Sequence, residues 1–272
     1  MNAKIPYAVC SSHIGKRPNH EDNFLFNEKY LTSDMQKNMA NHSGIFFIGN
    51  PKSAVSLFAV SDGMGGHNAG EVASRICVEK LAVLEKEIQH CLSIKEAVST
   101  IQTGIGEINS IVCQESRRND ELKGMGATLV ILVVCGIESA ILNIGDSRAY
   151  FFSNNTLAQI TKDNTEGQRL LDLGLLTRKE LLSFPARKNL SRYIGYSQAG
   201  FVLQADEYYP DLGNGVLLLC SDGISDGLSD SQIENILCTE KDLECAGRRL
   251  IDESIAAHNA DNATAILIPM RR

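Results

Sequence analysis

Aspartates lie at the boundaries of apolar segments throughout this 272-residue chain. The recurring pairs are Asp62-Gly63, Asp146-Ser147, Asp222-Gly223 and Asp261-Asn262, and Glu21-Asp22 adds two acids near the amino end. A single Asp-Gly pair is typical of a turn, but the repetition favours carboxylates that converge on one rim of a sheet. Because like charges repel, such a cluster needs protons or cations. Oxygen ligands favour a hard divalent cation such as Mg²⁺ or Mn²⁺.

That arrangement suits the hydrolysis of phosphate esters. Two divalent cations held close together can activate water and align the attacking and departing oxygens. Phosphoryl transfer needs this positioning and charge neutralisation more than it needs a protein nucleophile. Arg17 precedes the first acidic pair, and a guanidinium can donate two parallel hydrogen bonds to a phosphate. We therefore expect Arg17 to bind substrate phosphate; an ordinary surface arginine is the alternative.

Short β-branched and aromatic segments predict a protein rich in sheet. They are IPYAVCS, IFFIG, SLFAVSD, ATLVILVV, SAILNIG, RAYFF, FVLQADE, VLLLCSD and ATAILI. Several follow one another without an intervening helical segment, which favours antiparallel pairing over βαβ units. No Pro-rich, Gly/Ser-rich or charged linker separates them, so we expect residues 1–272 to form a single domain.

Helical patterns interrupt the strands in pairs. Residues 68–90 place Val72, Ile76, Val83, Leu84 and Ile88 at helical spacing. A second helix should begin at a capping box formed by Ser93 and Glu96, with a buried stripe of Val98, Ile101, Ile105, Ile108 and Val112. Thr177 with Glu180 and Ser229 with Gln232 predict two further capping boxes, and residues 242–258 a final helix. The chain should be a layered α+β domain, with a sheet sandwich inside and helices outside.

Composition argues against several other classes of function. A net charge of −7 does not favour a nucleic-acid-binding surface. The eight cysteines contain no C-x-x-C pair, so they fit buried thiols in a reducing compartment better than a zinc or redox motif. No apolar run is long enough to span a bilayer, and the amino end has no signal-peptide pattern. We therefore expect a cytoplasmic protein with no membrane or nucleic-acid partner.

Six short motifs, found in family order, resemble the metal-dependent Ser/Thr protein phosphatases of type 2C in their bacterial form. They are RPNHED (17–22), SDGMGGH (61–67), GMGAT (124–128), GDSR (145–148), CSDG (220–223) and DN (261–262). The resemblance spans nearly the whole chain. It implies a four-layer α-β-β-α sandwich, two antiparallel sheets flanked by helix pairs, with a dinuclear metal centre at one edge.

The resemblance also implies a set of metal ligands. The set comprises Glu21, Asp22, Asp62, Gly63, Asp146, Asp222 and Asp261. Asp62 would bridge two ions, Mn²⁺ or Mg²⁺, and Gly63 would ligate through its carbonyl. Asp222 and Asp261 would be direct ligands of one ion. Asp146, together with Asp222, would hold a third and weaker ion.

Glu21 is implied to reach the other ion largely through water, with Asp22 as a water-mediated partner. Arg17, Asp62 and Asp222 would then form the catalytic group, and a hydroxide bridging the ions would attack phosphorus. The implied substrates are phosphoserine and phosphothreonine in proteins, in a signalling role that opposes a cognate Ser/Thr kinase. We expect the protein to act as a monomer.

Two positions depart from the family pattern. Met64 stands where some members have a histidine that acts as general acid, which leaves protonation of the departing group to metal-bound water. His67 is expected in a turn or at a helix entry. Asn164 stands where the family usually has histidine after aspartate, and an amide cannot take a proton role near neutral pH. The segment from about 165 to 196 would be the flap beside the metals, which affects substrate choice.

Two other functions remain open from the sequence. The chain could be an inactive phosphatase-like signalling or binding module, although retention of the ligand set argues against it. It could also be a phosphomonoesterase of small metabolites. Ser147 and Ser221 lie in no G-x-S-x-G motif, so we expect them in strand-end turns and not as nucleophiles.

Overall fold

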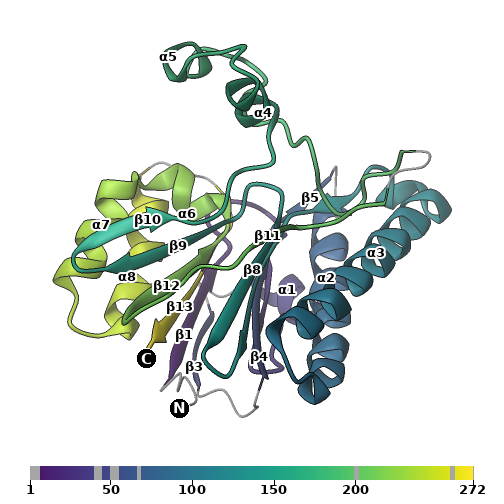
Figure 1. The fold of residues 1–272 in the computed structure, drawn as a ribbon. Helices are drawn as coiled ribbons and strands as arrows, with labels where there is room; N and C mark the ends of the chain where they lie inside the picture. The colour runs from purple at the N-terminus through teal and green to yellow at the C-terminus, as the bar shows by residue number, and fades with distance from the viewer. Residues whose placement is uncertain are drawn as a thin grey trace.

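Two antiparallel sheets are stacked face to face, with helices on both outer faces (Figure 1). The structure is a computed structural model that describes residues 7–39, 45–49, 55–65, 69–198, 202–257 and 261–271. His67 lies outside these residues. The expected four-layer α+β sandwich is confirmed. No helix in the described ranges is long and apolar enough to cross a membrane.

The sheets have six and five strands, and all of their pairings are antiparallel. The first runs in the order β10 (Thr156–Gln159), β9 (Arg148–Ser153), β12 (Gly215–Cys220), β13 (Ala263–Met270), β1 (Ala8–His13) and β3 (Ile45–Gly49). The second runs β11 (Asp206–Tyr208), β8 (Glu138–Ile144), β7 (Leu129–Cys135), β4 (Val55–Ser61) and β2 (Asn23–Phe26). A two-residue ladder joins β5 (Gly63–Met64) to β6 (Gly126–Ala127).

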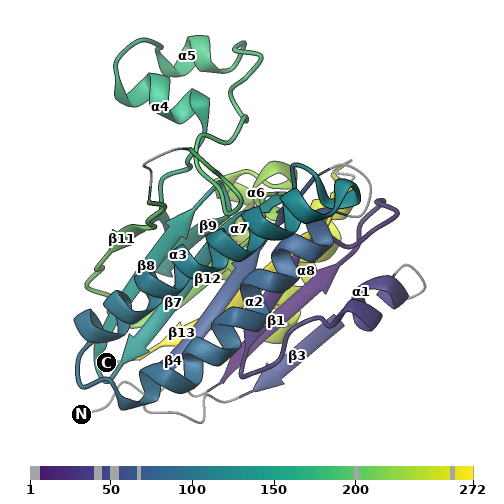
Figure 2. The ribbon, with the colours of Figure 1, turned by 90° about the vertical axis from the view of Figure 1, so that its right-hand side faces the viewer.

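Each sheet is covered by its own helices. The long pair α2 (Ala69–Glu87) and α3 (Ile94–Arg118) packs on the five-stranded sheet, as Figure 2 shows. Helices α6 (Asp222–Gly227), α7 (Asp230–Thr239) and α8 (Leu243–Ala256) lie on the side of the six-stranded sheet. The short α1 (Ser33–Met39) precedes β3, and two 3₁₀ turns, Ile88–His90 and Asp120–Leu122, flank α3. Three apolar cores result, one between the sheets and one under each helical layer.

The predicted helix starts are confirmed, with one difference in detail. Ser93 caps α3 by accepting from the Glu96 N–H at 3.2 Å, but the Glu96 carboxylate accepts from Leu92 and not from Ser93. The boxes at Thr177 and Ser229 are complete. All five residues of the predicted α3 stripe are buried. The capped start of α3 and its buried apolar face therefore both lie where the sequence predicted them.

Two details of the sequence prediction were wrong. In α2 the buried face is made by small and medium residues such as Ala73, Cys77 and Leu81, while Val83 is 54% exposed. In the predicted strand FVLQADE, the described residues 202–205 are not in a strand, which begins at Asp206. Before that point the backbone of Ala205 bonds to the Gln102 side chain of α3, as donor at 3.0 Å and as acceptor at 2.9 Å. The backbone of Ala205 therefore pairs with a side chain of α3 and not with a neighbouring strand.

Residues 165–196 are called here the flap segment. It contains α4 (Glu166–Asp172), which the sequence did not predict, and α5 (Arg178–Leu181), which it did. Its α4 and α5 region projects above one end of the sandwich (Figure 1), whereas Ile194 near its end bridges Ala127 and is fully buried in the core under α2 and α3. Three backbone hydrogen bonds join the stems of the flap segment: Glu166 N–H to Asn189 O at 2.8 Å, Gly167 N–H to Arg187 O at 3.3 Å and Ser191 N–H to Asn164 O at 2.8 Å. The flap therefore begins and ends at one narrow base.

Ile105→Ala should lower the free energy of unfolding by roughly 2–5 kcal/mol, because Ile105 is fully buried between α3 and its sheet. Val83→Ala is the matched control on the neighbouring helix: it should change stability by less than about 0.5 kcal/mol, since the side chain is mostly in solvent. Urea unfolding followed by circular dichroism measures both. Similar losses in the two variants would contradict the assigned faces.

Candidate functional site

The acidic residues lie at the ends of strands, as predicted. Asp62 joins β4 to β5, Asp146 lies in the turn between β8 and β9, and Asp261 precedes β13. Asp222 follows β12 as the first residue of α6, so the expected turn there is the start of a helix. The charges of Asp22, Asp146, Asp222 and Asp261 all raise the pKa of Asp62. Acids from distant parts of the chain therefore meet at one site.

Asp62 is held by its backbone. Its N–H donates to Thr128 Oγ1 at 2.9 Å, and its carbonyl accepts from the Thr128 N–H at 2.8 Å. Thr128 Oγ1 also bonds to Ser147 Oγ at 2.7 Å, and both of these side chains are buried. The link runs from the end of β4, through the start of β7, to the neighbour of Asp146. It leaves the Asp62 carboxylate free to face the other acids.

Gly63 sits where no side chain fits. A Cβ there would lie 2.0 Å from the carbonyl oxygen of Gly70 and 2.8 Å from that of Glu21. The Gly63 N–H donates to this Glu21 carbonyl at 3.1 Å, and Ser74 Oγ donates to it at 2.5 Å. The close approach places Glu21 against the first turn of α2, where the Gly70 N–H is a hydrogen-bond donor that lowers its pKa. Glycine is thus required by packing alone.

Asp22 is buried and only half satisfied. Its Oδ2 accepts from Ser221 Oγ at 2.7 Å, and Ser221 Oγ in turn accepts from the Thr264 N–H at 3.0 Å. Its Oδ1 has no hydrogen-bond partner in the part of the chain that the structure describes. Ser221 thus positions an acid, which the strand-end-turn interpretation missed. A buried carboxylate oxygen without a donor is costly unless a proton or cation reaches it.

Arg17 and Asp261 form an ion pair at the edge of the cluster. The Arg17 guanidinium donates to Asp261 Oδ2 at 2.7 Å, with both side chains partly exposed. Asn262, the next residue, ties the segment together: its Oδ1 accepts from the Glu21 N–H at 2.7 Å and its Nδ2 donates to Ile14 O at 2.7 Å. The structure thus brings Arg17 beside the acids, where we expected it. Its guanidinium there bonds to the Asp261 carboxylate.

Asn164 connects the Asp146 turn to the base of the flap. The Gly145 N–H donates to Asn164 Oδ1 at 3.0 Å, and the Asn164 N–H donates to Gly145 O at 2.7 Å. Asn164 Nδ2 donates to Asp206 Oδ2 at 2.9 Å, and Arg192 forms an ion pair with the same carboxylate. An amide can bond to both groups at once. The Asn164 side chain thus joins the Asp146 turn to the flap base.

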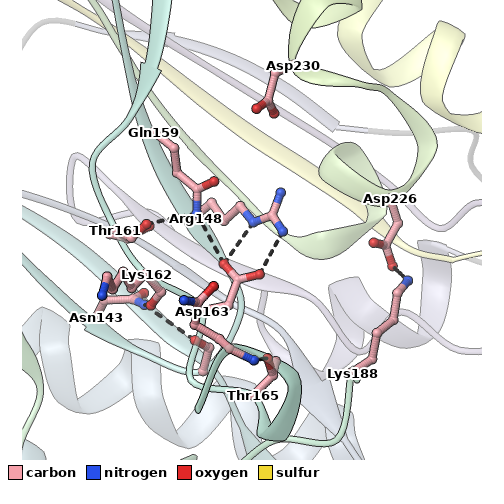
Figure 3. A network of polar contacts seen from close by, with 12 residues as sticks. Asn143, Arg148, Gln159, Thr161, Lys162, Asp163, Thr165, Lys188, Asp226 and Asp230 are labelled. Atoms are coloured by element: carbon pink, nitrogen blue, oxygen red, sulfur yellow. Dashed lines mark hydrogen bonds and ion pairs between the residues drawn. The ribbon is translucent and has the colours of Figure 1, made fainter. Parts of the chain in front are cut away.

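Arg148 holds the other side of the flap base. It donates to Asp163 through Nε at 2.8 Å and Nη2 at 2.6 Å, as Figure 3 shows. Figure 3 also shows Lys188 of the flap paired with Asp226 of α6. The flap is therefore joined to the sandwich by charge pairs on both of its stems.

Electrostatics in the cluster favour protonated acids when no cation is present. Loss of hydration is the largest cause in every case, although several of these residues keep part of their surface exposed. It raises the pKa of Glu21 and of Asp22 to about 7, of Asp146 to about 8 and of Asp222 to about 6. Nearby acids add to each shift. Asp62 lies in hydrogen-bonding reach of Asp222 and has a pKa raised well above its ordinary value.

These features fit divalent cations. Oxygen donors, mutual repulsion and the orphaned Asp22 Oδ1 are the properties of a hard-cation site. Among the described residues, no group of three or more His, Cys, Asp or Glu side chains is arranged to hold a metal by itself. Backbone carbonyls and water would therefore have to complete each shell, as is usual for Mg²⁺.

A cavity of about 230 Å³ opens between the acids and the flap. It is lined by Asp146, Arg148, Asp163, Thr165, Gln168, Leu181, Leu182, Arg187, Lys188, Asp222, Ser225 and Asp226. Two of the predicted ligands and both stems of the flap thus border one space. Sequence reasoning missed Thr128, Lys188 and Asp226 as members of this region, and it singled out Asn164 only as a departure from the family pattern. Of the three missed residues, only Thr128 had a signal, its place in the GMGAT motif.

Comparison with known proteins agrees with this architecture. The family profile for Protein phosphatase 2C matches residues 46–253. The serine/threonine phosphatase stp of Listeria welshimeri is 31% identical over 229 residues, 84% of this chain and 88% of that protein. The solved structure of Stp1 from Staphylococcus aureus has a TM-score of 0.80 at 26% identity, with 100% of this chain and 97% of that one covered. The PstP catalytic domain in complex with 2 manganese ions has a TM-score of 0.74 at 27% identity, with 98% and 100% covered.

The stacked-sheet fold and these matches define the class as metal-dependent protein serine/threonine phosphatases. The chain belongs to the protein phosphatase 2C family. The resemblance seen in six short sequence motifs is thereby confirmed, and the substrates of the class are phosphoproteins.

The metal-free protein should lose stability as the pH rises from about 4 to 8. The carboxyls of the cluster titrate at about 6 to 8 when folded, against 3.8 to 4.5 for ordinary acids. Across this interval the folded chain holds more protons than the unfolded chain, so the free energy of unfolding falls with pH. Saturating Mn²⁺ should restore more stability at pH 8 than at pH 5, since it binds the ionised acids.

Melting temperatures in chelator and in Mn²⁺, at both pH values, measure this effect. Glu85 lies away from the cluster, near the end of α2, and burial raises its pKa to about 7 as well. Glu85→Gln therefore removes the contribution of one carboxyl that does not belong to the cluster. Buried His20, whose pKa is lowered to about 3, contributes a slope of the opposite sign only below about pH 6.5. A melting temperature in chelator that rises from pH 5 to pH 8 in this variant would refute the assignment.

Proposed function

We propose that the acidic cluster binds two divalent cations, Mn²⁺ or Mg²⁺, and hydrolyses phosphoserine and phosphothreonine in proteins. The observation that supports it most is the convergence of dehydrated acids from five separate segments around Asp62. The proposed ligands are Glu21, Asp22, Asp62, Gly63 through its carbonyl, Asp222 and Asp261, with Asp146 and Asp222 at a weaker third position. The PstP structure with 2 manganese ions supports the choice of metal.

Bound cations would supply Lewis acidity that activates a water and neutralises phosphoryl charge. The chain itself positions the reactants. The backbone of Asp62 is fixed through Thr128, so its carboxylate can face both proposed cation positions. Asp22 stays aligned through Ser221, and Glu21 through its backbone bond to Asn262. Because these partners are neutral, they orient the acids without offsetting the negative charge that would attract the cations.

Arg17 is placed to bind the substrate phosphoryl group. Its pair with Asp261 holds the guanidinium at the exposed edge of the cluster, and half of its side chain remains accessible. The charges of Glu21 and Asp222 also favour its cationic form. One nitrogen edge bonds to Asp261, which leaves other N–H groups of the fork for phosphoryl oxygens. Asp261 would thus orient Arg17 in addition to its proposed role as a ligand.

The proposed physiological role is the reversal of a Ser/Thr kinase reaction on proteins. The name of the Listeria relative, a serine/threonine phosphatase, supports the residue type. The alternative, a small-molecule phosphomonoesterase, differs in substrate and not in chemistry. Competition between phosphopeptides and small phosphoesters separates the two.

Asp222→Asn should lower the turnover of p-nitrophenyl phosphate by orders of magnitude in saturating Mn²⁺, because an amide removes the negative charge of a proposed ligand. Wild-type turnover should require added metal and disappear in chelator. Asp120→Asn, an exposed acid in the 3₁₀ turn after α3, is the matched control and should behave as wild type. Metal-independent turnover would refute the mechanism.

Arg17→Ala should reduce kcat/KM for a phosphothreonine peptide roughly ten- to hundredfold, mainly through KM, because charge-assisted hydrogen bonds to phosphate are lost. Arg118→Ala is the control, since that arginine lies on the exposed end of α3. Steady-state assays with both variants give the split between KM and kcat. An unchanged KM would count against phosphate binding by Arg17.

A further inference from the structure

The cavity beneath the flap has, on its flap side, one cationic side chain that no acidic residue in the described part of the chain neutralises. Its cations are Arg148, Arg187 and Lys188. Arg148 is neutralised by Asp163 and Lys188 by Asp226. For the Arg187 side chain, the described part of the chain provides no hydrogen bond or ion pair, although it is exposed and borders the cavity. One guanidinium is therefore available to an incoming group.

The backbone of Arg187 is held in place. The Arg187 N–H donates to Phe184 O at 3.2 Å, and its carbonyl accepts from the Gly167 N–H at 3.3 Å. At Gly167 a Cβ would lie 2.6 Å from this carbonyl and 2.6 Å from Leu181 Cδ1. The two stems of the flap thus touch at this point, and α4 fixes where the Arg187 side chain starts. Because the backbone at Arg187 is already ordered, binding a ligand there costs only the conformational entropy of the side chain.

The opposite wall of the same cavity holds Asp146 and Asp222, members of the proposed cation site. Leu181 and Leu182 form an apolar wall, and Leu182 is 76% exposed. A phosphorylated side chain bound at the acids would leave its neighbours in the peptide beside this wall and Arg187. An acidic neighbour would complement the unpaired guanidinium.

We propose that Arg187 is a specificity-determining residue that selects phosphoprotein segments with an acidic side chain next to the phosphorylated serine or threonine. The shared chemistry is an anionic oxygen group, either a carboxylate or a second phosphate. This inference rests on the proposed function, because it assigns the substrate class of the same site. Arg187 acts on substrate choice and takes no part in the bond-breaking step.

The test uses phosphothreonine peptides that differ at one position, scanned over two residues on each side of the phosphothreonine. That position is Glu, Gln, Lys or phosphoserine. In Mn²⁺-loaded wild-type enzyme, the Glu peptide should have a KM roughly two- to fivefold below that of the Gln peptide, the range of an exposed ion pair. The phosphoserine arm shows whether a second phosphate is preferred to a carboxylate. High ionic strength should weaken either preference.

Arg187→Ala should abolish this preference, and Arg187→Glu should reverse it in favour of the Lys peptide. A merely structural role would lower kcat/KM for all peptides alike. Arg178→Ala is the matched control: this flap arginine starts α5, is exposed and does not border the cavity. The control should keep the wild-type preference.

The outcomes separate the two levels of the proposal. If the wild type hydrolyses p-nitrophenyl phosphate but has equal KM values for the Glu, Gln, Lys and phosphoserine peptides at every position, this inference is wrong and the proposed function stands. If the wild type hydrolyses no phosphoester in Mn²⁺, the proposed function itself fails. A preference for Glu that is insensitive to salt and persists in both Arg187 variants would also overturn the role of Arg187.

Discussion

Repulsion between carboxyl groups that have lost much of their hydration is the constraint on which the rest of this structure depends. Asp62 faces the charges of Asp22, Asp146, Asp222 and Asp261, and its pKa rises far above the ordinary value. Side chains that repel one another move apart unless a rigid scaffold holds them. Two stacked sheets with an apolar core on each side provide such a scaffold, since each of these acids lies within two residues of a strand end.

The groups that orient these acids are mostly neutral. Thr128, Ser221 and Asn262 each bond to backbone or carboxylate atoms of the cluster. A lysine or arginine in the same place would offset the negative charge and weaken the attraction for a divalent cation. Hydroxyl and amide groups avoid this, because they fix geometry without adding net charge. The exception, Arg17, lies at the exposed edge, where a substrate phosphate can reach it.

The sequence predicted the layered fold and the positions of Asp62, Asp146 and Asp261 at strand ends, because β-branched and aromatic composition and turn dipeptides are local signals. It failed where a partner distant in sequence decides the conformation. Residues 202–205 have strand composition, but Gln102 of α3 takes the hydrogen bonds of Ala205. The face of α2 was misjudged at Val83, because small residues such as Ala73 pack closest to the sheet. Whether the acids act as metal ligands stays a prediction.

Charge balance in the flap could not be read from sequence at all. Arg187 and Lys188 are neighbours of the same sign, yet Lys188 is neutralised by Asp226 while no ion pair with Arg187 occurs among the described residues. The difference arises because α6 begins at Asp222 and turns Asp226 toward one flap stem only, as Figure 3 shows for the Lys188 pair. A chain with a net charge of −7 can therefore present a local positive group beside its most acidic site. In the proposal made for Arg187, that local contrast, and not the overall charge, determines which phosphorylated segments the site attracts.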